Sequence, residues 1–156
     1  ELSRERPTDG DVWFRVAEAY LKADSLKQAT DAGKKAIRRE DSARAYDLMG
    51  RILSRRKAWI RNAPPYFRKA LAKDPTFVDA VYHLAQYHHQ LGEEDEERFL
   101  RETIEIDPTY AQAYLDLGRF EFDRGENDEV RWAFQGYIDL KPDSPDGYYG
   151  LAVLAT

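Results

Sequence analysis

Apolar and small residues recur at helical spacing in the stretch AQAYLDLGRFEFDRG, residues 111–125. Steps of three, four and seven residues place one set of side chains on a single helix face: Tyr114, Leu117, Gly118 and Glu121. The small Gly118 allows a second helix to approach closely, and Gly125 predicts a turn. The stretch therefore predicts an amphipathic helix that ends at a glycine turn.

A second amphipathic stretch follows, NDEVRWAFQGYIDL, residues 127–140. We expect Asn127 or Asp128 near its N-cap, because side-chain oxygens there accept hydrogen bonds from free backbone N–H groups. Its predicted buried stripe consists of Val130, Phe134 and Tyr137. Pro142 closes the unit, so residues 111–144 predict two antiparallel helices.

The same arrangement repeats along the chain with a period near 34 residues. A large residue opens each helical pattern, in steps of 33, 35, 33 and 34, at Trp13, Tyr46, Val81, Tyr114 and Tyr148. A small residue always stands four positions later: Ala17, Gly50, Ala85, Gly118 and Ala152. Prolines mark the later junctions, at Pro75, Pro108 and Pro142. Helix pairs repeated at a fixed period are typical of a helical solenoid, so we predict an all-α fold.

With these positions, the chain resembles the tetratricopeptide repeat (TPR) family, which has a large residue, then Leu-Gly, later Ala and aromatic positions, and a closing Pro. The best copy, residues 111–144, matches this pattern at Tyr114, Leu117, Gly118, Gly125, Phe134 and Pro142. It departs at Glu121, where the family usually has Tyr, and at Val130 and Tyr137, where it usually has Ala. The resemblance implies a right-handed α-solenoid, a superhelix of antiparallel helix pairs.

The repeat register divides the chain into an N-terminal extension, residues 1–9, and a TPR domain, residues 10–156. The predicted repeats span 10–42, 43–77, 78–110 and 111–144, and a final helix spans 145–156. The second repeat has one extra residue around KAWIRN, so we expect a longer connection between its helices. Pro64 and Pro65 fit the first turn of the following helix, where their missing N–H groups cost nothing, and Asn62 is the expected cap.

The resemblance also implies a scaffold for protein–protein contact, in which first helices line a concave groove that binds a peptide or helical segment of a partner. The predicted groove residues are Phe14, Arg15, Arg51, Arg55, Tyr82, His83, Gln86, His89, Arg119 and Phe122. Aromatic and arginine side chains supply much of the binding energy at protein interfaces, and this set contains both. In the alternative interpretation, these side chains pack against one another across neighbouring repeats.

Charge is unevenly distributed along the chain, whose 156 residues carry a formal net charge of -5. Residues 1–78 hold 18 Lys and Arg against 11 Asp and Glu, a net +7, and residues 79–156 hold 6 against 18, a net -12. Such a dipolar chain can orient a charged partner or stack head to tail with copies of itself. The acidic run 93–97 is expected at a solvated helix start, where carboxylates suit the helix dipole.

A basic cluster at Arg51, Arg55, Arg56 and Lys57 raises nucleic acid or an anionic membrane as a partner, but the acidic balance of the chain argues against a long polyanion. No apolar run reaches the roughly 18 residues that a membrane span needs. We therefore expect a protein or peptide partner, with no nucleic acid and no membrane span.

The last stretch, SPDGYYGLAVLAT, predicts the first helix of a fifth repeat with apolar residues on several faces. Solenoids usually end with a polar capping helix. Two interpretations remain open: the parent chain continues with further repeats, or this helix docks onto another copy of the molecule. The second describes a structural self-assembly module, a homo-oligomer guided by the charge dipole, with Tyr148, Leu151 and Leu154 as its self-association residues.

The sequence contains no nucleophile elbow, no glycine-rich phosphate loop and no zincin motif. We therefore predict no enzyme, cofactor or metal site, although the segment could be the recognition module of a larger enzyme.

All three histidines lie in YHLAQYHHQLG, residues 82–92, and the register assigns His88 to the core and His83 and His89 to the groove. The last two are six residues apart, about 9 Å along a helix, which is too far to share one metal ion.

Overall fold

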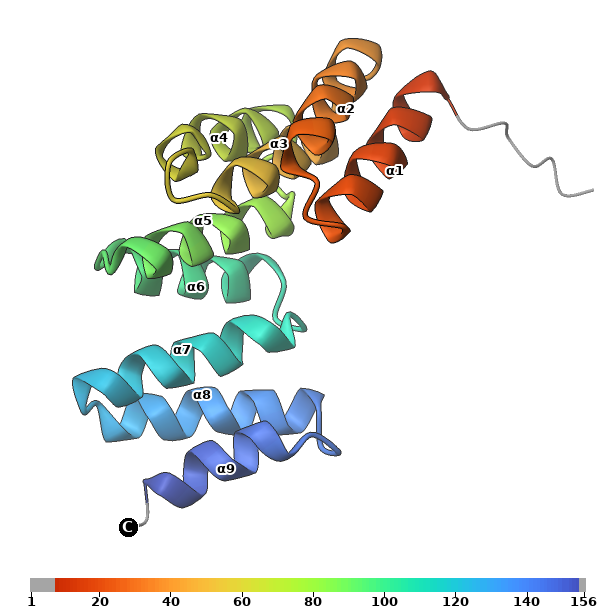
Figure 1. Ribbon diagram of the computed structural model, residues 1–156. Helices are drawn as coiled ribbons and strands as arrows, with labels where there is room; N and C mark the ends of the chain where they lie inside the picture. The colour runs from red at the N-terminus through yellow and green to blue at the C-terminus, as the bar shows by residue number, and fades with distance from the viewer. Residues whose placement is uncertain (1–7, 155–156) are drawn as a thin grey trace, which may run out of the picture. The chain divides into compact units, whose positions relative to one another are not determined.

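The computed structural model describes residues 8–154, and within this range every regular element is helical. The elements are α1 (Asp9–Lys22), α2 (Leu26–Arg39), α3 (Ala43–Ser54), the 3-10 turn η1 (Ile60–Asn62), α4 (Pro64–Lys73), α5 (Val78–Leu91), α6 (Asp95–Ile106), α7 (Ala111–Arg124), α8 (Asn127–Leu140) and α9 (Pro145–Val153). Figure 1 shows this order, and the chain forms two compact units, Glu1–His83 and Leu84–Thr156, whose boundary lies inside α5. Within residues 8–154, no helix has the length and apolar character that crossing a membrane requires.

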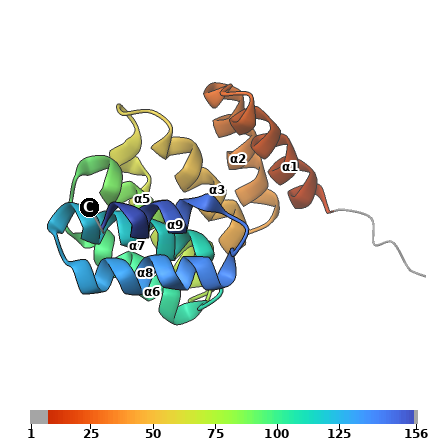
Figure 2. The ribbon, with the colours of Figure 1, turned by 90° about the horizontal axis from the view of Figure 1, so that it is seen from below.

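In the first unit, successive helices pack side by side. A turn of three residues joins α1 to α2, so the two run antiparallel, and both views show them as neighbours (Figures 1 and 2). The helix α1 begins at Asp9, and Thr8 caps it: the Thr8 side chain accepts from the backbone N–H of Asp11, while the Asp11 carboxylate accepts from the backbone N–H of Thr8. This capping box satisfies two backbone donors that would otherwise be free. The predicted extension, residues 1–9, thus ends one residue inside α1, and residues 1–7 lie outside the described range.

The pair α3 and α4 packs through a glycine. Gly50 on α3 leaves room for the ring of Phe67, which is 1% exposed, as the small-residue series predicted. The connection between these helices is long and contains η1, as the extra residue predicted. Pro64 opens α4, which confirms its place in the first turn, but the expected cap is wrong. Asn62 belongs to η1, because the chain enters α4 through this tight turn, and Ala63 stands at the N-cap without a side-chain bond.

In the second unit, α7 and α8 pack through two aromatic–glycine contacts, in which a ring of each helix lies against a glycine of the other. A Cβ on Gly118 of α7 would lie 2.8 Å from Cε1 of Phe134 on α8. In the opposite direction, a Cβ on Gly136 of α8 would lie 2.5 Å from Cδ1 of Tyr114 on α7. Both distances are too short for a real Cβ, so only glycine allows this approach. Gly125 ends α7 in the left-handed region, with φ 78, which confirms the predicted glycine turn.

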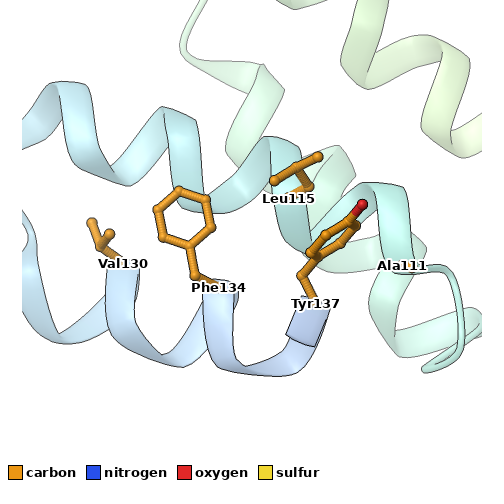
Figure 3. Packing of buried hydrophobic residues seen from close by; sticks show 5 residues of the cluster. All are labelled: Ala111, Leu115, Val130, Phe134 and Tyr137. Carbon is orange, nitrogen blue, oxygen red and sulfur yellow. The ribbon is translucent and has the colours of Figure 1, made fainter. Parts of the chain in front are cut away.

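One hydrophobic cluster of the second unit lies between α7 and α8. Figure 3 shows Val130, Phe134 and Tyr137 pointing from α8 toward α7, where Leu115 and Ala111 meet them. The predicted buried stripe of α8 is therefore confirmed. The predicted cap is displaced by one residue, since α8 begins at Asn127 and Glu126 occupies the N-cap.

The final helix α9 packs on both α8 and α7. Two of the three residues predicted for self-association, Leu151 and Leu154, pack against the cluster that contains Phe134. The third, Tyr148, is 51% exposed. The structure thus uses the two leucines to dock α9 onto its own unit.

Candidate functional site

The predicted groove residues all come from first helices of the repeats or their ends, and the structure assigns them to two units. Those of the first unit are Phe14 and Arg15 on α1, Arg51 on α3, Arg55 directly after α3, and Tyr82 and His83 on α5. Those of the second unit are Gln86 and His89 on α5 and Arg119 and Phe122 on α7. We call these sets the first-unit face and the second-unit face and describe each by itself.

On the first-unit face, arginines of the second repeat reach carboxylates of the first. Nη1 of Arg51 lies 3.7 Å from Oε1 of Glu18, and both side chains are about one-third exposed. Nη2 of Arg55 lies 3.6 Å from Oδ1 of Asp24 in a more exposed pair. Ion pairs this open to water contribute only about 0–1 kcal/mol. Both arginines are therefore held only weakly by their present acidic neighbours.

Aromatic residues of the first-unit face lie deeper than the sequence suggested. Phe14 is partly buried, with the guanidinium of Arg44 5.1 Å from its ring centroid. Tyr82 is only 6% exposed, so its expected exposure in a groove is wrong. A residue type alone does not show which side of a packed helix the ring occupies.

His83 is tied to the interior of the first unit. Its Nδ1 lies 2.7 Å from Oδ1 of Asp47, whose side chain is 5% exposed, and its ring stacks on Phe67 at 5.8 Å. Asp47 comes from α3, so this contact joins the second and third repeats. His83 thus partners a buried carboxylate and is not free to line a groove.

On the second-unit face, carboxylates gather around His89. Nδ1 of His89 lies 3.0 Å from Oε1 of Glu96, and the histidine is 73% exposed while the Glu96 side chain is 10% exposed. Burial raises the pKa of Glu96; the bond from His89 opposes this, and the charges of Asp116 and Asp123 on α7 add to the rise. The acidic run 93–97 does open α6, but the expectation of a solvated start is wrong for Glu96, because it packs beneath His89.

Arg119 and Phe122 continue the second-unit face along α7. Nη1 of Arg119 lies 3.4 Å from Oδ1 of Asp116 in an exposed contact. Phe122 is 41% exposed, which is unusual for a phenylalanine in a packed helix. Gln86 is also exposed. This face therefore combines an exposed aromatic ring and an exposed arginine with carboxylates that range from buried (Glu96) to exposed (Asp123).

The remaining histidine, His88, packs against the second helix of its repeat, as the register predicted. Its ring stacks on Phe99 of α6 at 5.2 Å, and its Nδ1 lies 2.7 Å from Oε2 of Glu93. Each histidine thus has a different carboxylate partner. Among residues 8–154, no three His, Cys, Asp or Glu side chains are grouped to hold a metal ion.

The sequence did not predict a charge cluster in the second unit that is built around one buried carboxylate, Glu121. Arg101 on α6 contacts three carboxylates, at 2.7 Å for Glu97, 2.9 Å for Glu121 and 3.0 Å for Glu129. Glu121 is 2% exposed, and burial, reinforced by the charge of Glu97, raises its pKa although Arg101 opposes the rise. Burial alone would lower the pKa of Arg101, but its bonds to Glu97 and Glu129 outweigh burial and raise it. The one signal was Glu121 itself, a carboxylate where the family usually has Tyr.

Comparison with known proteins now adds to this geometry. The sequence model of a tetratricopeptide repeat family matches residues 66–99, from α4 to α6. Solved structures match over nearly the whole chain. MamA is 20% identical, with a TM-score of 0.76, over 93% of this chain and 80% of that one. The chain contains a tetratricopeptide repeat and has the TPR fold. The predicted all-α solenoid of antiparallel helix pairs is likewise confirmed.

Two further structures resemble this TPR protein. TTC0263 of Thermus thermophilus has a TM-score of 0.80 at 18% identity, covering 97% of this chain and 84% of that one. YrrB, described as a TPR protein with an unusual peptide-binding site, has a TM-score of 0.69 at 22% identity, covering 94% and 76%. The search of curated proteins found no match. The TPR fold is typical of protein–protein interaction scaffolds and is typically not enzymatic.

Proposed function

We propose that this TPR protein binds a segment of a partner protein, extended or helical, along the faces of its first helices. The observation that carries the proposal is the second-unit face, where Phe122 is 41% exposed beside Arg119 and the carboxylates of Asp116 and Asp123. An exposed aromatic ring and an arginine are side chains that supply binding energy at interfaces. A TPR protein with a peptide-binding site, YrrB, has the same fold and supports this choice.

The carboxylates indicate the chemistry of the segment that the second-unit face would bind. Glu96, Asp116 and Asp123 lie near enough for the two aspartates to raise the pKa of Glu96. A lysine or arginine of the partner would relieve this repulsion, while an apolar side chain would cover Phe122. We therefore propose a segment that pairs a basic residue with an apolar one.

The arginines of the first-unit face suit a negatively charged part of the partner segment. Arg15 is exposed, and Arg51 and Arg55 form weak ion pairs with Glu18 and Asp24. A partner carboxylate would gain a guanidinium there at the loss of about 0–1 kcal/mol of existing ion pairing. Tyr82 and His83 have little free surface, so they would act by supporting their neighbours.

The experiment first recovers a partner by cross-linking to the tagged chain and then measures its binding to purified variants. We expect the double variant that carries Phe122→Ala and Arg119→Glu to bind at least about tenfold more weakly. A loss of this size corresponds to the removal of at least one interface anchor. The matched control is Trp132→Ala, because Trp132 is 48% exposed but lies on the second helix α8. Charge reversal at Arg51 and Arg55 is compared in the same way with charge reversal at Arg38 and Arg39, exposed residues of α2. Equal losses in the face variants and the controls would contradict the proposal.

A further inference from the structure

The pair of His89 and Glu96 on the second-unit face combines an exposed side chain with a buried one. Nδ1 of His89 lies 3.0 Å from Oε1 and 3.1 Å from Oε2 of Glu96, so the imidazole faces both carboxylate oxygens. The His89 side chain is 73% exposed, whereas that of Glu96 is 10% exposed. The imidazole thus lies on the solvent side of the carboxylate and can move away without opening the core.

The ends of two helices favour a charge on each member of this pair. His89 lies in the last turn of α5, where free carbonyl groups suit a cation, and Glu96 lies in the first turn of α6, where free N–H groups suit an anion. An ionised carboxylate only accepts hydrogen bonds, so Nδ1 then carries the hydrogen and Nε2 is left to take up a proton. Proton uptake at Nε2 converts a negatively charged pair into a neutral ion pair.

The charges that α7 places near the pair are mostly negative. Burial raises the pKa of Glu96, the bond and the charge of His89 lower it, and the charges of Asp116 and Asp123 add to the rise. The cation that α7 contributes is Arg119, whose Nη1 lies 3.4 Å from Oδ1 of Asp116. The state of His89 therefore decides how much negative charge this part of the face presents.

The neighbouring histidine has the same chemistry but a different carboxylate. Nδ1 of His88 lies 2.7 Å from Oε2 of Glu93, in the turn before α6, and the His88 side chain is 12% exposed. A substitution at His88 removes an imidazole from α5 and leaves the pair of His89 and Glu96 in place. It is the matched control for a substitution at His89.

We propose that His89 and Glu96 form a pH switch on the second-unit face: a protonated His89 holds Glu96 and keeps a basic residue of the partner away, and a neutral His89 leaves the carboxylate to that residue. The inference rests on the proposed function of this face and adds its regulation. An imidazolium competes with the partner's ammonium or guanidinium for the same carboxylate and repels it. A neutral imidazole does neither, because a carboxylate has lone pairs for a second donor.

Acidification should therefore release the partner. Histidine is the side chain whose charge ordinarily changes between pH 5 and 8, so His89 gains a positive charge as pH falls. Glu96, whose pKa burial raises, loses its negative charge at a higher pH than an ordinary carboxyl group does. Both changes reduce the attraction for a basic residue. One ionisation around the ordinary imidazole value of about 6.5 corresponds to about tenfold weaker binding at about pH 5.5 than at about pH 7.5.

The free chain tests the switch without a partner. Carbon NMR follows the Glu96 carboxyl signal against pH in the wild type, in His89→Gln and in the control His88→Gln. Glutamine keeps a hydrogen-bond donor but cannot take up a proton. Because the bond and the charge of His89 lower the pKa of Glu96, this carboxyl group should take up its proton at a higher pH in His89→Gln and at the wild-type pH in His88→Gln. Equal titration of Glu96 in all three proteins would overturn the proposal.

Binding of the recovered partner tests the regulation itself. From about pH 7.5 to about pH 5.5, we expect about tenfold weaker binding for the wild type and for His88→Gln, and a change of less than about threefold for His89→Gln. The partner's own titrating groups affect all three proteins equally. Full pH dependence in His89→Gln would contradict the switch and leave the proposed function standing. Binding at about pH 7.5 that survives Phe122→Ala with Arg119→Glu would instead contradict the proposed function.

Discussion

Replacing Arg101 by Met should expose how strongly the second unit depends on its buried carboxylate. Arg101 neutralises Glu121, which is 2% exposed, and also contacts Glu97 and Glu129. Methionine keeps the length of the side chain and removes the charge. The variant leaves one buried carboxylate without a counter-ion and brings its two acidic neighbours into repulsion with it.

The size of the effect follows from the exposure of the two partners. Breaking a fully buried ion pair on one side costs about 3–5 kcal/mol. The Arg101 side chain is 37% exposed, so water weakens its interactions, and we expect a loss of about 2–3 kcal/mol in the free energy of unfolding. A double variant, with Met at both Arg101 and Glu121, should recover to within about 1 kcal/mol of the wild type, because a matched apolar pair needs no charge compensation.

The loss should also depend on pH. Burial raises the pKa of Glu121 in the folded state above its unfolded value, so stability decreases as pH rises through the interval between the two values. Removing Arg101 removes a cause that lowers this pKa, which widens the interval upward. The deficit of the variant should therefore be largest near neutral pH and shrink as pH falls toward about 4.5, where the carboxylates take up protons.

Urea unfolding followed by circular dichroism at about pH 7.5 and about pH 4.5 measures both effects. The control is Arg98→Met on the same helix, since Arg98 is 66% exposed in a surface pair with Asp95 and should cost less than about 1 kcal/mol. A deficit for Arg101→Met no larger than that of the control, or one independent of pH, would refute the reasoning.

Two further substitutions test the packing and the capping. Gly118→Val should destabilise the protein by at least about 2 kcal/mol, because a Cβ there would lie 2.8 Å from the ring of Phe134. An unfolding midpoint equal to that of the wild type would contradict the close packing of Phe134 on Gly118. Thr8→Ala removes the capping box of α1 and should cost about 1 kcal/mol, visible as faster amide hydrogen exchange at the start of that helix. Unchanged exchange in that first turn would show that the cap contributes nothing.

The sequence predicted the helix pairs because repeat positions carry local information. Gly50 and Gly118 recur in one register with Phe67 and Phe134, and the structure brings each ring onto its glycine. Such a pattern predicts the contact without any knowledge of distances, because a ring and a small residue that recur at a fixed period are typical of two closely packed helices. The helix start at Pro64 was predictable for the same reason: proline restricts the backbone of its own residue.

The buried charges could not be predicted, because each depends on a partner far along the chain. Asp47 is paired with His83, 36 residues away, and Glu121 with Arg101, 20 residues away. A carboxylate looks the same in sequence whether it faces water or such a partner. The inward position of Tyr82 has the same origin, since packing around a helix decides its exposure and its residue type does not.

The central claim is that a partner segment contacts the first helices of this TPR protein. The most direct measurement places a photo-cross-linking amino acid at Phe122 on α7 or, in a matched variant, at Trp132 on α8, two exposed aromatic positions of the same unit. With the recovered partner present, we predict a cross-linked product from position 122 and little or none from position 132. Cross-linking from position 132 alone would place the partner on the second helices and contradict the account.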